Sequence, residues 1–234
     1  MNKKTGKLYG IGVGPGNTEL LTIKANKILN NIPVICSPKS SAKRESIALS
    51  IVKPLIENKI AKSEIEIIEP VFPMTEDNDE LEKHWKLAAD LIAKKLDGGY
   101  DVGFITLGDP SIFSTFSYIQ KKLEHRYEIE MVPGITSFTA CASSIGKPLV
   151  EKDEVLVIVP KIDDRFENLL DNGNSIVLMK ASRNTRELEE KVLKHDKEEI
   201  ISVENATQKD EKIIKGFSTD KPYLTTTIIK SSEK

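Results

Sequence analysis

The stretch from Asp101 to Ile119, DVGFITLGDPSIFSTFSYI, constrains the fold more than any other part of the chain. Its apolar run at 102–107 ends at the turn Gly108-Asp109-Pro110, which predicts a buried parallel strand, a tight turn and a short helix opened by Ser111. Ligands of parallel sheets bind beyond the carboxyl ends of the strands, and Gly108 has no Cβ to keep a ligand from the backbone. Asp109 therefore either contacts a ligand at this edge or only caps the turn.

Length and composition limit the classes of protein. The 234 residues fit one large or two small domains, and 39% hydrophobic with 30% charged residues is typical of a globular protein. A net charge of -2 argues against general affinity for nucleic acid or membranes. We expect no signal peptide and no membrane span, hence a cytoplasmic protein. Two cysteines and three scattered histidines predict no metal site.

The N-terminal segment predicts a strand at 7–13, a turn at Gly14-Pro15-Gly16, and a helix capped by Asn17 or Thr18. This strand-turn-helix order is that of a nucleotide-binding unit. Its glycines alternate, however, and no register gives G-x-G-x-x-G with an acid at the end of the next strand. No phosphate-binding loop of the G-x-x-x-x-G-K-[ST] type occurs either. We expect a loop that a ligand approaches closely but that does not hold a pyrophosphate.

The remaining pattern predicts an α/β protein with two domains. Pro133-Gly134 marks the expected boundary between an N-terminal domain, residues 1–133, and a C-terminal domain, residues 134–234. Strands at 33–36, 64–69, 102–107 and 128–132, separated by helices, predict a largely parallel first sheet. Three late strands at 199–204, 212–216 and 223–230, with few helices between them, predict a mixed second sheet.

The sequences of the loops that follow the predicted strands resemble the motifs of a known family when they are taken in chain order. They are YGIGVGPGN, TLGDPSIFSTF, VPGITSF, VLMKAS, VENATQKDE and PYLTTTII. In this order they resemble the tetrapyrrole (corrin/porphyrin) methylase family over nearly the whole chain. The run TLGDPSIFSTFSYI, with PKSS after the second strand, is similar to the members that methylate C-20 of precorrin-2 or cobalt-factor II. The resemblance implies two α/β domains with S-adenosylmethionine in the cleft between them, a tetrapyrrole substrate and a homodimer.

Cofactor contacts are implied residue by residue by the same resemblance. The positions that match are Pro15, Leu107, Gly108, Asp109, Ser114, Thr115, Thr136, Ser137, Met179, Ala206 and Thr225. Ser137 departs from the family, which often has Ala there. The chemistry agrees, because a sulfonium with an apolar adenine and no phosphate needs a carboxylate, backbone acceptors and small residues. Met179 would add polarizable contact, although a lone strand-end methionine is more often part of a core.

A substrate rimmed with carboxylates calls for cations. Only five of the 34 basic residues are arginines, so their places are informative. The candidates follow strands: Lys39, Lys43 and Arg44 in one loop, and Lys180, Arg183 and Arg186 near another. An ordinary solvated surface explains each of them equally well. The catalytic base stays unassigned, with Tyr118, Glu204 and His84 all conceivable.

Three alternatives remain open. A methylase of the same fold could act on another tetrapyrrole carbon, or on an acceptor such as ribosomal RNA or a translation-factor histidine. The net charge of -2 disfavours RNA. A dinucleotide-dependent oxidoreductase conflicts with the glycine spacing. A binding module without catalysis would keep the same pocket, and only methyl transfer separates it from an enzyme.

Overall fold

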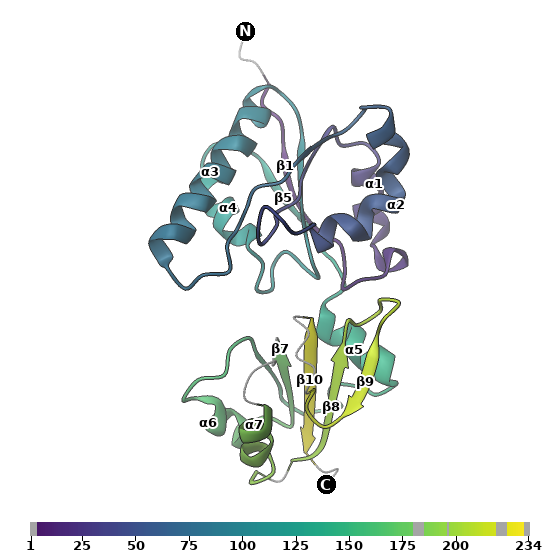
Figure 1. Ribbon diagram of the computed structural model, residues 1–234, viewed down its shortest axis with the longest axis vertical. Helices are drawn as coiled ribbons and strands as arrows, with labels where there is room; N and C mark the ends of the chain where they lie inside the picture. Colours follow the sequence, from purple (N-terminus) through teal and green to yellow (C-terminus); the bar gives the residue numbers. More distant parts are fainter. Residues whose placement is uncertain (1–3, 180–184, 196, 219–223, 232–234) are drawn as a thin grey trace. The chain divides into compact units, whose positions relative to one another are not determined.

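The computed structural model describes residues 4–179, 185–195, 197–218 and 224–231 (Figure 1). Internal contacts divide the chain into two compact units, Met1–Thr136 and Ser137–Lys234. The division into independent domains at 1–133 and 134–234 stays a prediction. Within the described residues, no helix is both long and apolar enough to cross a membrane.

The first unit is a parallel sheet of five strands in the order β3-β2-β4-β1-β5. The strands are β1 (Leu8–Gly12), β2 (Val34–Cys36), β3 (Glu66–Ile68), β4 (Val102–Thr106) and β5 (Ile129–Val132). All pair in parallel, so β1, β2, β4 and β5 end at one side of the sheet, which we call the carboxyl edge. The central strand predicted at 102–107 is confirmed as β4.

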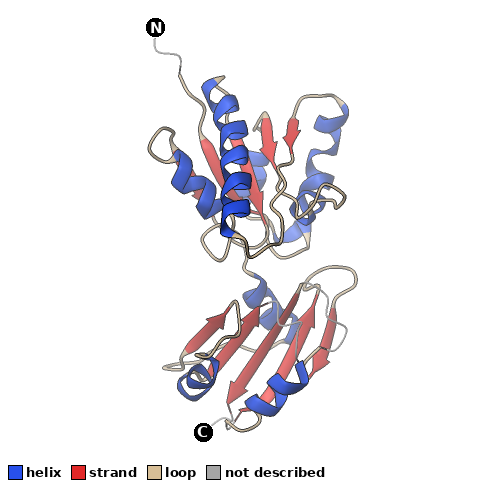
Figure 2. Cartoon of the chain, turned by 60° about the vertical axis from the view of Figure 1, so that its left-hand side comes forward, coloured by secondary structure: helices blue, strands red, loops and turns tan. Residues whose placement is uncertain are grey.

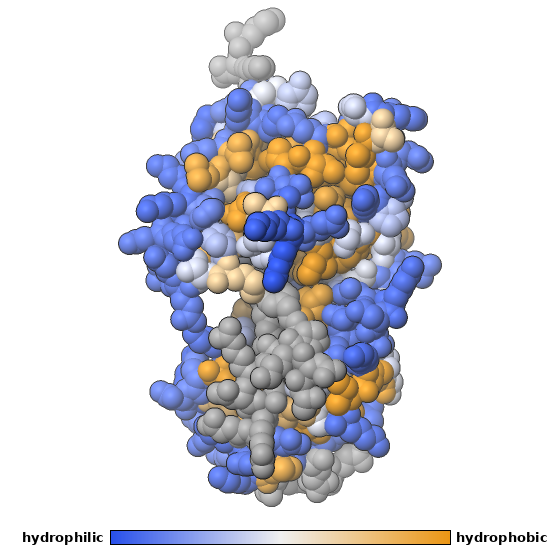
Figure 3. Space-filling model, viewed as in Figure 1, coloured by the Kyte–Doolittle hydropathy of each residue, from blue (hydrophilic) through white to orange (hydrophobic). Residues whose placement is uncertain are grey.

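Helices cover both faces of this sheet, as Figure 1 shows. They are η1 (Thr18–Leu20), α1 (Ile23–Leu29), α2 (Ile47–Ala61), α3 (Asn78–Asp97) and α4 (Phe116–Leu123). One core cluster joins α3 and α4 to the sheet through residues such as Ile92 and Phe116, and another joins α1 and α2 through Leu29 and Val52. On the face drawn in Figure 3, hydrophilic residues cover these helices and apolar residues are visible between them.

The second unit has a mixed sheet in the order β6-β7-β10-β8-β9. Its strands are β6 (Leu156–Val159), β7 (Ser175–Met179), β8 (Lys197–Glu204), β9 (Lys212–Lys215) and β10 (Thr225–Ser231), and its helices are α5 (Ser137–Ile145), α6 (Phe166–Asn172) and α7 (Thr185–Val192). Only β6 and β7 pair in parallel within this sheet as described, and β10 runs antiparallel to β7 and β8 (Figure 2). The predicted α/β class, with a parallel first sheet and a mixed second sheet, is confirmed.

Two helix predictions were wrong in detail. The helix expected from Ser111 begins at Phe116, because Phe113 has a φ of 49° and helical φ values are negative. The helix expected after Asn17 is two elements instead. Asn17 caps η1, and Thr22, whose backbone is extended, caps a new helix by accepting a hydrogen bond from the Ala25 N–H.

Three strand ends cross so closely at the carboxyl edge that only glycine fits. A Cβ on Gly134 would stand 2.1 Å from the carbonyl oxygen of Gly108, and a Cβ on Gly12 would stand 2.5 Å from the same atom. Gly14 and Gly108 also exchange backbone hydrogen bonds. The Gly108 N–H donates to the Gly14 carbonyl with an N···O distance of 2.8 Å, and the Gly14 N–H donates to the Gly108 carbonyl at 3.3 Å. The loops after β1, β4 and β5 are therefore packed backbone against backbone.

We predict that Gly134→Ala destabilises the first unit by about 3 kcal/mol, because the new methyl group must push a neighbouring backbone aside. The control is Gly14→Ala in the same unit, since a Cβ there meets nothing nearer than 3.5 Å and only the φ of 77° is unfavourable, at a cost of about 1–2 kcal/mol. Urea unfolding followed by fluorescence of the single tryptophan, Trp85, reports on this unit. A loss in the free energy of unfolding for Gly134→Ala that is no larger than the loss for Gly14→Ala would contradict the close crossing.

Candidate functional site

Asp109 fastens two of the loops at the carboxyl edge. Its Oδ2 accepts a hydrogen bond of 3.0 Å from the backbone N–H of Gly134, which follows β5. Its Oδ1 accepts bonds from the N–H and the hydroxyl of Ser111, at 2.8 and 2.5 Å. The carboxylate is therefore first of all a tie between the loops after β4 and β5. Because a carboxylate has about four lone-pair sites, it retains capacity for one ligand bond.

The hydrogen bonds also fix the charge of this group. Partial burial by itself raises the pKa of the Asp109 carboxyl, but the hydroxyl and N–H of Ser111 and the N–H of Gly134 together outweigh it and lower the pKa below its usual value of 3.8. Asp109 is thus ionised at neutral pH and carries a negative charge at the carboxyl edge.

Other predicted residues of the first unit lie in the loops at the carboxyl edge, near Asp109. Pro15 is buried directly after Gly14, and Leu107 packs on the core beside Gly108. Gly108 has a φ of 65°, and its Cβ position meets no atom nearer than 3.9 Å, from Ile135 and Thr136. That space is one that a side chain would fill and that a ligand could enter, so the backbone here fits a ligand that needs close approach.

Ser114 and Thr115 have different surroundings. The Ser114 hydroxyl lies 2.9 Å from the Thr106 hydroxyl at the end of β4, and it accepts a hydrogen bond of 3.1 Å from the Phe116 N–H. Ser114 therefore secures the start of α4 to the strand end. Thr115 occupies the position before α4, where its side chain makes no capping hydrogen bond. Both residues remain predicted cofactor contacts.

In the second unit, the strand register brings predicted residues to one end of the inner strands of the mixed sheet. Met179 ends β7 and lies opposite Thr226 of β10, while Thr225 lies opposite Glu204 of β8. Ala206 follows β8 and is buried, and Ser137 begins α5, which contacts β10. Met179, Thr225 and Ala206, predicted from separate motifs, thus share one end of the mixed sheet, and Ser137 lies on a helix that contacts β10. Their role in cofactor binding stays a prediction.

The predicted cations differ in what they contact. The Lys39 Nζ is 3.0 Å from the Glu69 carboxylate and is largely buried, so its charge is already paired. Lys43 and Arg44 follow β2 at the carboxyl edge, are exposed, and form no ion pair with any described residue. Lys180 and Arg183 lie outside the described residues. Arg186 falls in α7, and its side chain also lies outside what the structure describes.

The conceivable bases are also placed. Tyr118 is 40% exposed on α4 and stacks on Trp85 with ring centroids 3.8 Å apart. Glu204 is buried at the end of β8 and accepts a hydrogen bond from the Ser218 hydroxyl. His84 lies on α3. Burial raises the pKa of both cysteine thiols, that of Cys141 to about 12, so neither is a thiolate at neutral pH.

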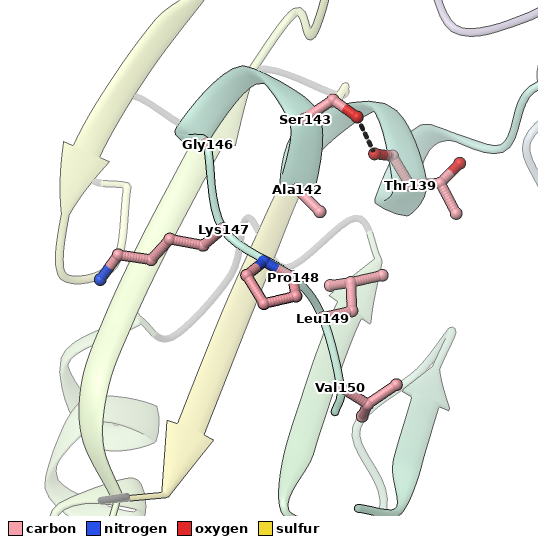
Figure 4. Close-up of a pocket in the computed structure, with 8 residues that line it drawn as sticks. All are labelled: Thr139, Ala142, Ser143, Gly146, Lys147, Pro148, Leu149 and Val150. Atoms are coloured by element: carbon pink, nitrogen blue, oxygen red, sulfur yellow. Dashed lines mark hydrogen bonds between the residues drawn. The ribbon is translucent and has the colours of Figure 1, made fainter. Parts of the chain in front are cut away.

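Sequence reasoning missed Gly134 and Thr106, which hold Asp109 and Ser114. The Pro-Gly pair after β5 was a signal for the first, but it was interpreted only as a boundary. An open hollow of about 430 Å³ in the second unit is a different feature (Figure 4). It is lined by Thr139, Ala142, Ser143, Gly146, Lys147, Pro148, Leu149 and Val150. None of these is a predicted site residue, and Lys147, which extends away from the hollow, pairs with Glu199.

We predict that Asp109→Asn lowers the free energy of unfolding at pH 7 by about 1–2 kcal/mol, because the amide cannot accept from both Ser111 and Gly134 without a lost bond. The folded pKa is depressed, so this contribution is present above the pKa of the unfolded carboxyl and is lost as pH falls through the lower folded pKa. The difference between variant and wild type should therefore shrink below pH 3.8. Asp90→Asn, on the exposed face of α3, is the control. If the difference in the free energy of unfolding between Asp109→Asn and wild type did not depend on pH, the ionised Asp109 carboxylate would not be what joins the two loops.

Comparisons with known proteins agree with this architecture. The model of the family described as Tetrapyrrole (Corrin/Porphyrin) Methylases matches residues 7–221. The chain is 40% identical over 240 residues to the probable cobalt-precorrin-2 C(20)-methyltransferase of Methanocaldococcus jannaschii, with 98% of each chain covered. It is 33% identical over 178 residues to the cobalt-precorrin-2 C(20)-methyltransferase of Salmonella typhimurium, covering 75% of this chain and 73% of that one.

A solved structure supports the fold. The uroporphyrin-III C-methyl transferase of Thermus thermophilus, complexed with S-adenosyl homocysteine, matches with a TM-score of 0.65 at 20% identity, covering 96% of this chain and 97% of that one. The strand-end loops, the two sheets and the near full-length relatives lead to one conclusion. The chain belongs to the tetrapyrrole (corrin/porphyrin) methylase family.

Proposed function

We propose that this protein is an S-adenosylmethionine-dependent methyltransferase that methylates C-20 of a cobalamin precursor, cobalt-factor II or precorrin-2. The observation that carries the proposal is 40% identity over nearly the whole chain to a relative named for this reaction on cobalt-precorrin-2. Two such names favour the cobalt-loaded substrate over the metal-free one. The cobalt belongs to the substrate. Within the described residues, no three His, Cys, Asp or Glu side chains are grouped to hold a metal ion.

The carboxyl edge of the first unit fits the cofactor. When bound, S-adenosylmethionine supplies a methyl group on a sulfonium, open to in-line attack by a nucleophilic ring carbon. The open space at Gly108 admits a ligand to the backbone, and Asp109 offers a fixed negative charge with one acceptor site to spare. The glycines form no phosphate cradle. We assign to this edge the binding and orientation of the cofactor, through Pro15, Leu107, Gly108 and Asp109.

Positioning supplies most of the rate in this account. Holding two reactants in attack geometry can contribute about 7–11 kcal/mol, so the reaction needs little from side-chain chemistry. The loops that would hold the cofactor are secured by the hydrogen bond from the Gly134 N–H to Asp109 and by the Ser114–Thr106 contact, and rigid placement is what such catalysis requires. No residue is assigned as the base. The protein is further proposed to act in the cytoplasm, as its sequence pattern leads us to expect, and as a homodimer, which the family resemblance alone implies.

The test of the function is methyl transfer from labelled S-adenosylmethionine to cobalt-factor II and to precorrin-2, in parallel and without oxygen. We expect label in the tetrapyrrole at C-20, located by NMR, with faster turnover of the cobalt form. Label at another ring carbon would favour a methylase of the same fold with a different regiospecificity. Binding of S-adenosylhomocysteine without transfer to either tetrapyrrole would contradict the proposal and favour another acceptor or a binding module.

Arg44 gives a second prediction. Its guanidinium is exposed after β2 and has no ion-pair partner among the described residues, so it is available to a substrate carboxylate. We predict that Arg44→Gln raises KM for the tetrapyrrole about tenfold, with kcat and the Kd for S-adenosylhomocysteine nearly unchanged. The control is Arg165→Gln, because Arg165 is also exposed but is paired with Asp163. An unchanged KM in the Arg44 variant would mean that this arginine is an ordinary solvated residue with no role in substrate binding.

A further inference from the structure

Phe113 is held in a strained backbone conformation. Its φ of 49° lies in the left-handed region, which bulky side chains rarely adopt, and its side chain is 52% exposed. The other described non-glycine residues with positive φ are Ser63, Lys152, Asn205 and Thr207, all of them polar. Within the described residues, the Phe113 ring has no aromatic or cationic stacking partner. An exposed aromatic ring on a strained backbone points to a role outside stability.

The loop that carries Phe113 is fixed at both ends. Before it, Asp109 binds the Gly134 N–H and Ser111, and the Ile112 N–H donates to the Asp109 carbonyl at 3.4 Å. After it, the Ser114 hydroxyl contacts Thr106 and accepts from the Phe116 N–H. The strained conformation is therefore imposed by its neighbours, and the ring is presented to solvent in a defined place.

That place matches a planar acceptor with charged edges. The strand order β2-β4-β1 puts the loop of Phe113, after β4, between the loop of Lys43 and Arg44, after β2, and the loop of Pro15, after β1. An apolar ring thus has cations on one side and the predicted cofactor loop on the other. A tetrapyrrole has the complementary pattern, an extended π face with carboxylates around its rim.

We propose that Phe113 is a substrate contact, whose ring packs against the tetrapyrrole face and whose backbone strain is retained to present it. This inference rests on the proposed function and deepens it by naming a residue that recognises the acceptor. It predicts that different residues along the carboxyl edge bind the tetrapyrrole and the cofactor. Phe113 affects affinity for the tetrapyrrole, whereas Gly108 and Asp109 affect affinity for the cofactor.

The experiment compares three variants with the wild type. Phe113→Gly removes both the ring and the strain, so we expect Tm to be equal or higher and the Kd for cobalt-factor II, titrated by absorbance without oxygen, to rise about tenfold. The Kd for S-adenosylhomocysteine should stay within about twofold. Phe113→Tyr keeps the ring and should bind like the wild type. Ser63→Gly, exposed with a φ of 55°, relieves the same kind of strain elsewhere and should raise Tm without changing either Kd.

Each of the following results would overturn the inference. An unchanged Kd for cobalt-factor II in Phe113→Gly would remove the ring from the binding site. A lower Tm with equal loss of affinity for both ligands would make the ring structural. A wild-type protein that binds neither cobalt-factor II nor precorrin-2 would overturn the proposed function and this inference together. A wild type that methylates normally beside an unaffected Phe113→Gly variant would overturn this inference alone.

Discussion

The first unit depends on one steric constraint, the crossing of three backbones at Gly12, Gly108 and Gly134. A Cβ on Gly12 or Gly134 would come within 2.5 or 2.1 Å of the Gly108 carbonyl oxygen, so glycine is required at both positions for the loops to meet. Asp109 then holds the loops after β4 and β5 together, because its carboxylate accepts a hydrogen bond from the Gly134 N–H, 25 residues away in the sequence. The combination gives a carboxyl edge built of backbone groups and one fixed negative charge. Such a surface is suited to a cationic ligand without phosphate, which is the chemistry of the proposed cofactor.

The order of the strands arranges the proposed functions side by side. Along the edge, the loop after β2 carries exposed Lys43 and Arg44, the loop after β4 carries Phe113 and Asp109, and the loop after β1 carries Pro15. Acceptor recognition is thus proposed next to cofactor binding, in neighbouring loops of one sheet. An unfavourable feature, the strained backbone of Phe113, is found in one of these loops. This is where stability is commonly given up for function.

Much of the fold could be predicted, because apolar strands and glycine turns leave local signals. The strand β4, the parallel first sheet and the mixed second sheet all follow from patterns a few residues long. The start of α4 could not, since residues 111–115 contain no Gly or Pro to mark a turn, and contacts of Asp109 and Ser114 with other elements hold the turn at Phe113. The short helix α6 (Phe166–Asn172) was also missed. At the site, the motifs indicated Asp109 but not Gly134, its partner, and Lys39 appeared free although Glu69 neutralises it. Pairings between distant loops leave no local pattern.

The hydrogen bonds between the loops imply that the carboxyl edge is built before any ligand binds. The measurement to make is hydrogen exchange of the Gly134 and Gly108 amides, resolved by NMR with and without S-adenosylhomocysteine. Gly134 donates to Asp109 and Gly108 donates to the Gly14 carbonyl at 2.8 Å, so we expect both amides of the free protein to exchange at least about a hundredfold more slowly than in an unstructured peptide. Exchange at the unstructured rate in the free protein, with protection only after S-adenosylhomocysteine is added, would mean that the ligand builds the edge and would contradict the claim.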